Sequence, residues 1–353
     1  MPKKISATVI TGFLGAGKTT LIRHLIENAS GKRIALIINE FGDLGVDGEI
    51  LKGCGIEGCA ETDMIELSNG CICCTVAEDF LPALTKLIER DEAPDHIVIE
   101  TSGLALPQPL VRAFNWPEIR TRVTVDGVVT VVDGPAVAAG RFAADEDAVM
   151  RQRQSDETLS HETPLSELFE DQLACADMVV VNKSDLMADP AQVTKALTAR
   201  VREGVSVISA ARGQVQPGVL LGLGIGAEDD LAARHEVHHH HHHADDNSHH
   251  HDHDAFESFV VDLPELSDAT QLTDAVSQAI AAHDLLRVKG FAAIAGKPAR
   301  LLLQAVGPRI DVHFDRPFQP HEARATRLVV IGLAGLDRAA ISAALQGALD
   351  AAA

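Results

Sequence analysis

Aromatic and basic residues are both scarce in this chain of 353 residues. It has 11 Phe, one Trp and no Tyr, which is too few for a platform on which bases stack. Lys and Arg number 30 against 51 Asp and Glu, giving a formal charge of −21 with His neutral. A surface this acidic repels phosphate backbones and anionic membranes. The composition therefore disfavours nucleic acids and membranes as partners and favours cations.

Long apolar runs are also missing. No run reaches the ~18 apolar residues that a membrane span needs. Thr11 and Gly12 interrupt the apolar N-terminal stretch, and no cleavage site with small residues follows it, so we expect no signal peptide and a cytoplasmic protein. Three of the six cysteines fall within four positions, which favours metal or redox chemistry over a disulfide framework.

Short apolar runs alternate with helical patterns over the first 230 residues. This alternation predicts an α/β fold with a doubly wound, mostly parallel sheet covered on both faces. Helices are expected at about 18–29 and 80–90, and Cys175 is expected in the core. The expected strands are 5–11, 33–38, 96–99, 128–132, 178–181 and 205–208.

The composition changes sharply near residue 231. Residues 235–254 hold 11 His and five acidic residues with no Lys or Arg, so residues 231–255 are predicted to be a disordered, His-rich linker. The tract has three interpretations: an inserted purification tag, an inert linker, or a weak collector of metal ions, which we favour. Strand and helix patterns resume over 256–353, predicting a smaller α+β domain after a nucleotide-binding domain at 1–230.

A phosphate-binding motif lies between the first strand and the first helix. GFLGAGKT at residues 12–19 matches G-x4-G-K-[ST], whose backbone N–H groups surround phosphates at a helix N-terminus. Lys18 is expected to reach the β- and γ-phosphates, and Thr19 to ligate Mg²⁺. A dinucleotide fingerprint with Glu40 as its acidic residue is the alternative, disfavoured by Lys18 and Thr19. The expected nucleotide contacts here are Gly12, Gly15, Ala16, Gly17, Lys18, Thr19 and Thr20.

A base-recognition motif closes the strand at 178–181. In NKSD, the carboxylate of Asp185 can accept hydrogen bonds from the ring N–H and the exocyclic amine of guanine together, a pairing that adenine cannot make. We expect Asn182 to contact the purine edge and the stem of Lys183 to cover its face. Ser209 and Ala210, after the next strand, occupy the place where GTPases donate backbone N–H groups to the guanine oxygen. Together the motifs favour GTP over ATP or NAD.

The γ-phosphate side is predicted at the end of the strand 96–99. Glu100 can orient the water shell of Mg²⁺ or the attacking water, and the N–H of Gly103 can sense the γ-phosphate. The acid-bearing loop 39–48 (NEFGD and beyond) is expected to be a switch that Mg–GTP orders and hydrolysis releases. Asp133 also follows a strand, and its role is open.

A thiolate metal site is predicted at residues 71–74, which read CICC. Thiolates select transition metals over Mg²⁺, and two or three of them with a carboxylate, His or water complete four-coordination. The expected ligands are Cys71, Cys73 and Cys74, with Glu40 as a further candidate. Buried structural cysteines and a redox pair are the alternatives. Cys54 and Cys59 are additional cysteines upstream.

TGFLGAGKTT, NEFGD, ELSNGCICCTV, VIETSG, VVTVVD and NKSD together resemble the CobW-type metallochaperone GTPases, a branch of the phosphate-loop GTPases. The likeness continues through LLRVKGF and RLVVIG, so it covers nearly the whole chain. The stretch LKGCGIEGCAE is similar to the cobalamin-biosynthesis members. The resemblance implies hydrolysis of GTP to GDP and phosphate.

The same resemblance implies Co²⁺ as cargo, delivered toward corrin chelation to a client such as a cobaltochelatase. Relatives in the group serve zinc or nickel, so a zinc or nickel chaperone is the alternative. A homodimer is also compatible with the resemblance. Without an obvious arginine finger, intrinsic hydrolysis is expected to be slow. Two other classes stay open at this point: a metal buffer based on the His tract, and a dinucleotide-dependent redox enzyme.

Overall fold

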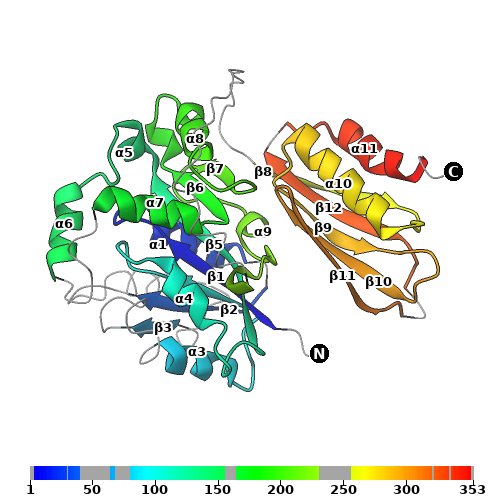
Figure 1. Ribbon diagram of the computed structural model, residues 1–353, viewed down its shortest axis with the longest axis horizontal. Coiled ribbons are helices and arrows are strands. Elements are labelled where there is room, and N and C mark those ends of the chain that lie inside the picture. Colours follow the sequence, from blue (N-terminus) through cyan, green and yellow to red (C-terminus); the bar gives the residue numbers. More distant parts are fainter. Residues whose placement is uncertain are drawn as a thin grey trace. The chain divides into compact units, whose positions relative to one another are not determined.

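A computed structural model describes residues 4–29, 31–39, 64–67, 80–155, 164–229, 256–319, 322–333 and 335–350. The chain divides into two compact units, Met1–His253 and Asp254–Ala353 (Figure 1). The finer division, with a linker at 231–255, stays a prediction because residues 230–255 lie outside the described part. Among the described residues, no helix is both long and apolar enough to cross a membrane.

The first unit is built on a parallel sheet. In the described residues it has seven strands in the order β3-β2-β4-β1-β5-β6-β7, and every neighbouring pair is parallel. Strands β4 and β6 are buried at every residue, as expected for strands covered on both faces. The bounds are β1 Ile5–Thr11, β2 Ile34–Asn39, β3 Met64–Leu67, β4 His96–Glu100, β5 Val123–Asp133, β6 Met178–Asn182 and β7 Ser206–Ala210.

Helices follow most strands and pack on the sheet. Leu84 of α3 and Phe114 after α4 belong to one buried apolar cluster with alternate strand residues such as Val9. Cys175 is fully buried at the end of α7, which confirms its predicted place in the core. The described helices of this unit are α1 Lys18–Glu27, α3 Leu81–Ile88, α4 Pro107–Ala113, α5 Gly134–Ala138, α6 Glu146–Ser155, α7 Leu165–Cys175, α8 Pro190–Thr198 and α9 Pro217–Leu220, with short 3-10 turns at Ser184–Leu186 (η3) and Ala227–Asp229 (η4).

The predicted α/β class is confirmed, but β3 was not predicted and one other strand is much longer than expected. The strand expected at 128–132 begins five residues earlier, at Val123. Asp126 and Gly127 interrupt the apolar pattern there, and the pairing of β1 with β5 shifts register at the same place, between Ala7 and Thr8. The buried carboxylate of Asp126 accepts hydrogen bonds from the backbone N–H groups of Leu223 and Gly224, both at 2.8 Å. Because the buried Asp126 interrupts the apolar pattern of β5, the sequence predicted only about half of this strand.

The second unit is an antiparallel sheet with two helices against one face. The described strands follow the order β11-β10-β9-β12-β8, and every neighbouring pair is antiparallel. Leu272 and Val276 of α10 and Ile341 of α11 share a buried apolar cluster with strand residues such as Val288 and Leu303. The predicted α+β architecture is confirmed. The bounds are β8 Phe256–Leu263, α10 Ala269–His283, β9 Arg287–Ala292, β10 Ala299–Val306, β11 Arg309–Pro317, β12 Thr326–Leu333 and α11 Arg338–Asp350.

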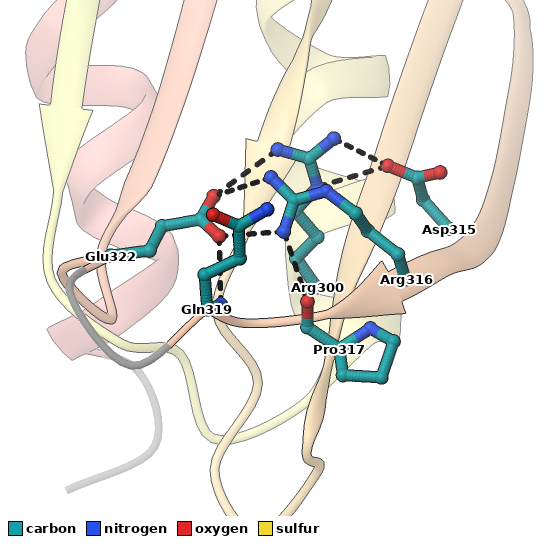
Figure 2. A network of polar contacts seen from close by, with 6 residues as sticks. All are labelled: Arg300, Asp315, Arg316, Pro317, Gln319 and Glu322. Carbon is teal, nitrogen blue, oxygen red and sulfur yellow. Dashed lines mark hydrogen bonds and ion pairs between the residues drawn. The ribbon is translucent and has the colours of Figure 1, made fainter.

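A network of ion pairs joins β10, β11 and the segment after them (Figure 2). Glu322 receives hydrogen bonds from Arg316 at 2.7 and 3.1 Å and from Arg300 at 3.2 Å. The backbone N–H of Gln319 also donates to it at 3.1 Å. Arg300 in addition pairs with Asp315 and lies over the ring of Phe291, 3.5 Å from its centroid. The hydrogen bond from Arg316 is the main cause that lowers the pKa of Glu322 to about 2.

This depressed pKa predicts a pH-dependent contribution to stability. Because the pKa of Glu322 is lower in the folded chain than its ordinary 4.5, its contribution is complete above pH 4.5 and declines as the pH falls toward about 2. Glu322→Gln is therefore expected to lower the unfolding temperature of the full chain at pH 7. The difference from wild type should shrink as the pH falls through that window, as measured by calorimetry.

Asp262→Asn is the control for this experiment. Asp262 pairs with Arg327, and both side chains are about two-thirds exposed, a setting in which an ion pair contributes little. Its effect should be small at every pH. An equal Glu322→Gln effect at pH 7 and pH 2 would contradict the assignment.

Candidate nucleotide site

The phosphate loop joins the end of β1 to the start of α1. Gly12 and Gly17 have φ values of 133° and 99°, which side chains other than glycine rarely adopt. A Cβ on Gly12 would lie 2.0 Å from the carbonyl oxygen of Val131, and one on Gly17 would lie 2.2 Å from Nδ2 of Asn182. Gly15 also has a positive φ. The glycines of the motif are therefore required by backbone conformation and by close neighbours.

Lys18 lies over this loop. Its side chain is 8% exposed, and its ammonium group donates hydrogen bonds to the carbonyl oxygens of Gly12, at 2.8 Å, and Phe13, at 3.4 Å. A cation held at the mouth of a glycine loop, beside the N-terminus of α1, provides positive potential where phosphates bind. Contact of Lys18 with the β- and γ-phosphates stays a prediction.

Thr19 and Glu100 face each other across two elements. Thr19 lies in the first turn of α1, and Glu100 ends β4, which pairs with β1 at Ile10. The hydroxyl of Thr19 donates a hydrogen bond to Oε1 of the buried Glu100 at 3.3 Å. A hydroxyl and a carboxylate beside a phosphate loop are the oxygen donors that Mg²⁺ prefers, so the residues present fit this ion.

Gly103 lies directly against the phosphate loop. A Cβ at this position would come within 2.7 Å of the backbone nitrogen of Leu14. The segment is attached to β1 as well, because the N–H of Thr101 donates to the carbonyl of Ile10 at 3.0 Å. The structure thus brings Gly103 close to the loop, as its predicted role at the γ-phosphate requires.

Asn182 connects the phosphate loop to the segment after β7. Its amide nitrogen donates to the carbonyl of Ala16 at 2.9 Å, and its amide oxygen accepts from the N–H of Gly213 at 2.8 Å. A Cβ on Gly213 would in turn meet the backbone of Thr20 and Leu21. The observed contacts of Asn182 are therefore within the protein and hold two loops together. Its contact with the purine edge stays a prediction.

Lys183 has a partner that the sequence did not reveal. Its ammonium group donates to Oδ2 of Asp133 at 2.6 Å, and Oδ1 of Asp133 accepts from the N–H of Ala136 at 3.1 Å. Asp133 pairs in register with Asn182 across β5 and β6, which explains how two residues 50 positions apart meet. Asp133 thus fixes Lys183, whose backbone is left-handed at φ 61°. The role of Asp133, which the sequence left open, is to hold the side chain of Lys183 in place.

Asp185, Ser209 and Ala210 lie at the same edge of the sheet. Asp185 is in η3, and Asn182 before it pairs with Ala210 at the end of β7. The hydroxyl groups of Ser209 and Thr194 are 3.0 Å apart. Nε of Arg212, an exposed residue that the motifs did not single out, lies 3.7 Å from Oδ2 of Asp185. In the sequence, only the position of Arg212 shortly after Ser209 and Ala210 could have pointed to it.

The predicted metal site lies outside the described residues. This applies to Glu40 and Cys71, Cys73 and Cys74, to Cys54 and Cys59, to most of the predicted switch at 39–48, and to the His tract. Within the described part of the chain, no group of three or more His, Cys, Asp or Glu side chains is arranged to hold a metal ion. The thiolate site therefore stays a prediction.

A parallel sheet with a phosphate loop after β1, an acid at the end of β4 and NKSD after β6 defines the chain as a P-loop GTPase. The family model of the CobW/HypB/UreG nucleotide-binding domain matches residues 6–209. A second model, the cobalamin synthesis protein cobW C-terminal domain, matches residues 256–349. The chain belongs to the CobW/HypB/UreG family and carries the CobW C-terminal domain, as the sequence predicted.

Three relatives resemble nearly the whole chain. A protein of Sinorhizobium sp named zinc chaperone CobW is 59% identical over 344 residues, which are 97% of this chain and 96% of the relative. A protein of the same name from Pseudomonas aeruginosa is 54% identical, with 98% and 92% covered. The zinc chaperone YjiA of Escherichia coli is 30% identical, with 93% and 94% covered. The dinucleotide-dependent alternative finds no support in this family.

Proposed function

We propose that this GTPase is a GTP-gated carrier of a divalent transition-metal ion. Mg–GTP orders the loop 39–48 against the cysteine segment and completes a site made by Cys71, Cys73 and Cys74, with Glu40 as a further ligand. Hydrolysis to GDP and phosphate loosens the loop and releases the ion to a client. Lys18, Glu100 and Gly103 serve the hydrolysis, and Asp185 selects guanine.

The observation that carries the proposal is where β2 and β3 end. Asn39 pairs with Leu67, and one residue earlier Ile38 pairs with Glu100 of β4. The chain therefore leaves both strands at the edge that holds Thr19 and Glu100. Cys71 follows Leu67 by four residues, which span at most ~14 Å when fully extended. Glu40 follows Asn39 directly, and these short connections to strands that end beside Glu100 support the proposal.

The cargo follows from chemistry and from relatives. Thiolates bind Zn²⁺ and Co²⁺ alike, so the ligand types do not choose between them. The names of the relatives, which are called zinc chaperones, support Zn²⁺ as the cargo. The likeness to cobalamin-biosynthesis members supports Co²⁺. We therefore propose that the cargo is either Zn²⁺ or Co²⁺. A cobaltochelatase is the proposed client only if the cargo is Co²⁺. Thr19 would hold Mg²⁺ and Glu100 would orient its water shell or the attacking water, and the ion would supply charge neutralisation at the phosphates.

The test is a metal titration of the full chain with Mg²⁺ and either a nonhydrolysable GTP analogue or GDP. A competing chelator measures Zn²⁺, and the thiolate-to-Co²⁺ charge-transfer band measures Co²⁺. The affinity should be about 5- to 150-fold higher with the GTP analogue, and by reciprocity each metal should tighten GTP binding equally. Replacing Cys73 and Cys74 by Ser should remove the tight site, whereas the matched pair Cys54→Ser and Cys59→Ser should retain it.

Two outcomes would contradict the proposal. Equal metal affinity with both nucleotides would exclude gating. If deletion of 235–253 removed all high-affinity binding, the His-tract buffer would replace the carrier. An intact, GTP-dependent site in that deletion variant supports the carrier.

A further inference from the structure

Gln172 is a buried polar residue that the nucleotide motifs do not include. It lies near the end of α7 and is fully buried. Its amide nitrogen donates two hydrogen bonds, to the carbonyl oxygens of Gly103 at 3.2 Å and Ala105 at 3.1 Å. Its own backbone carbonyl accepts from the hydroxyl of Thr130 on β5 at 2.9 Å. One amide group therefore joins a helix anchored on the sheet to the segment that follows Glu100.

That segment is held from two sides. The N–H of Ala105 donates to the carbonyl of Ser102 at 3.1 Å, which closes a turn with Gly103 inside it. On one side the turn lies against the phosphate loop, where a Cβ on Gly103 would come within 2.7 Å of the nitrogen of Leu14. On the other side its two carbonyls bind the amide of Gln172. The position of Gly103 is therefore set jointly by the phosphate loop and by Gln172.

The side-chain oxygen of Gln172 is not used in this arrangement. Oε1 of Gln172 is buried and has no hydrogen-bond partner among the described residues. A buried acceptor without a partner carries a desolvation cost that an apolar side chain of similar length would avoid. Gln172 therefore lowers the stability of the core through its buried oxygen while it holds the Gly103 turn through two hydrogen bonds. This balance indicates a role for Gln172 in positioning the turn.

We propose that Gln172 is a positioning residue for GTP hydrolysis. By holding the carbonyls of Gly103 and Ala105, it fixes the turn so that the N–H of Gly103 points to the γ-phosphate. Gln172 itself touches no substrate. The inference rests on the role proposed above for Gly103, and it extends the GTP site to α7, an element without any motif residue.

The test compares Gln172→Met with wild type in the full chain. Methionine is unbranched and flexible enough to fill the space, but it cannot donate to the two carbonyls. We expect kcat for GTP hydrolysis to fall roughly 10- to 100-fold, because small misplacements of aligned groups cost about that much. The affinity for GDP, which lacks the γ-phosphate, should stay unchanged, whereas the preference for GTPγS over GDP should decline.

Gln108→Met is the matched control. Gln108 on α4 is also a buried glutamine with an unpartnered Oε1 in the described structure, but its amide donates to the carbonyl of Asp171 at 3.3 Å and leaves the Gly103 turn alone. Gln108→Met should lower the unfolding temperature about as much as Gln172→Met does, but it should keep the kcat of wild type. A kcat for Gln172→Met equal to that of wild type or of Gln108→Met would overturn the proposal.

Gln172→Glu gives a second, independent readout. A protonated carboxyl group can still donate one hydrogen bond to the turn, whereas a carboxylate donates none and repels both carbonyls. The kcat of this variant relative to wild type should rise as the pH is lowered, and a flat ratio would also overturn the proposal. Equal metal affinity with both nucleotides in wild type would reject the carrier but leave these comparisons of kcat intact, so the two failures are distinguishable.

Discussion

Asp185→Asn is expected to move the base preference of the site from guanine to xanthine. The carboxylate accepts from the ring N–H and the exocyclic amine of guanine, whereas an amide presents one acceptor and one donor. The amide donor would face the guanine amine and leave it without a partner, but it fits the carbonyl that xanthine has there. We expect GTP affinity to fall by at least about 100-fold, because a polar site rejects an analogue whose hydrogen bonds do not match.

The measurement is competition binding of GTP and xanthosine triphosphate to both proteins. Asp189→Asn is the control, because Asp189 caps α8 by accepting from the N–H of Gln192 and an Asn side chain can do the same. Arg212, 3.7 Å from Asp185, loses an ionic partner in the variant, so unfolding temperatures accompany the titration. If Asp185→Asn still bound GTP as wild type does, Asp185 would not be the base-selecting residue.

Lys18→Met is expected to abolish most GTP hydrolysis. In the structure its ammonium group donates to the carbonyls of Gly12 and Phe13 of the loop, where we propose that the β- and γ-phosphates bind. Negative charge on the transferred group has to be stabilised in the transition state, and removal of one such donor costs about 100- to 1000-fold in kcat. Methionine keeps the length and apolar stem of the side chain, so the loop should retain its packing.

Single-turnover hydrolysis at saturating GTP measures this effect apart from binding. Lys32→Met, which removes an exposed charge outside the loop, is the control and should leave kcat unchanged. A Lys18→Met protein that hydrolyses GTP within a few-fold of wild type would contradict the phosphate-loop assignment of this residue.

The parallel sheet was predictable because its central strands are continuous apolar runs. Two of the edge strands, β3 and β11, were not, although the edge strand β7 was expected at 205–208. β3 has four residues, one of them Glu66, which is too short for a periodicity. β11 alternates exposed Arg309 and Asp311 with the half-buried Ile310 and Val312. Such polar patterns are typical of edge strands, whose charges discourage pairing with other chains, and they hide the strand from a search for apolar residues.

The site residues came together for one geometrical reason. In a parallel sheet the carboxyl ends of all strands lie at the same edge, so motifs at the ends of β1, β4, β6 and β7 meet there. What the motifs did not reveal are contacts between positions far apart in sequence. Asp133 meets Lys183 through strand pairing, and Gln172 meets Gly103 through helix packing. Neither contact leaves a local pattern, because each depends on the tertiary fold.

The amide of Asn182 occupies the space where a side chain on Gly17 would lie, with Nδ2 only 2.2 Å from that Cβ position. The two positions are 165 residues apart in the chain, yet they compete for one volume. A side chain at 17 would displace the amide of Asn182 and so release both Ala16 and Gly213, and the φ of 99° at residue 17 would strain it even if residue 182 were smaller. A redesign of this part of the chain should therefore keep Gly17 unchanged, because a replacement there would disturb its own backbone and the link that Asn182 makes between two distant loops.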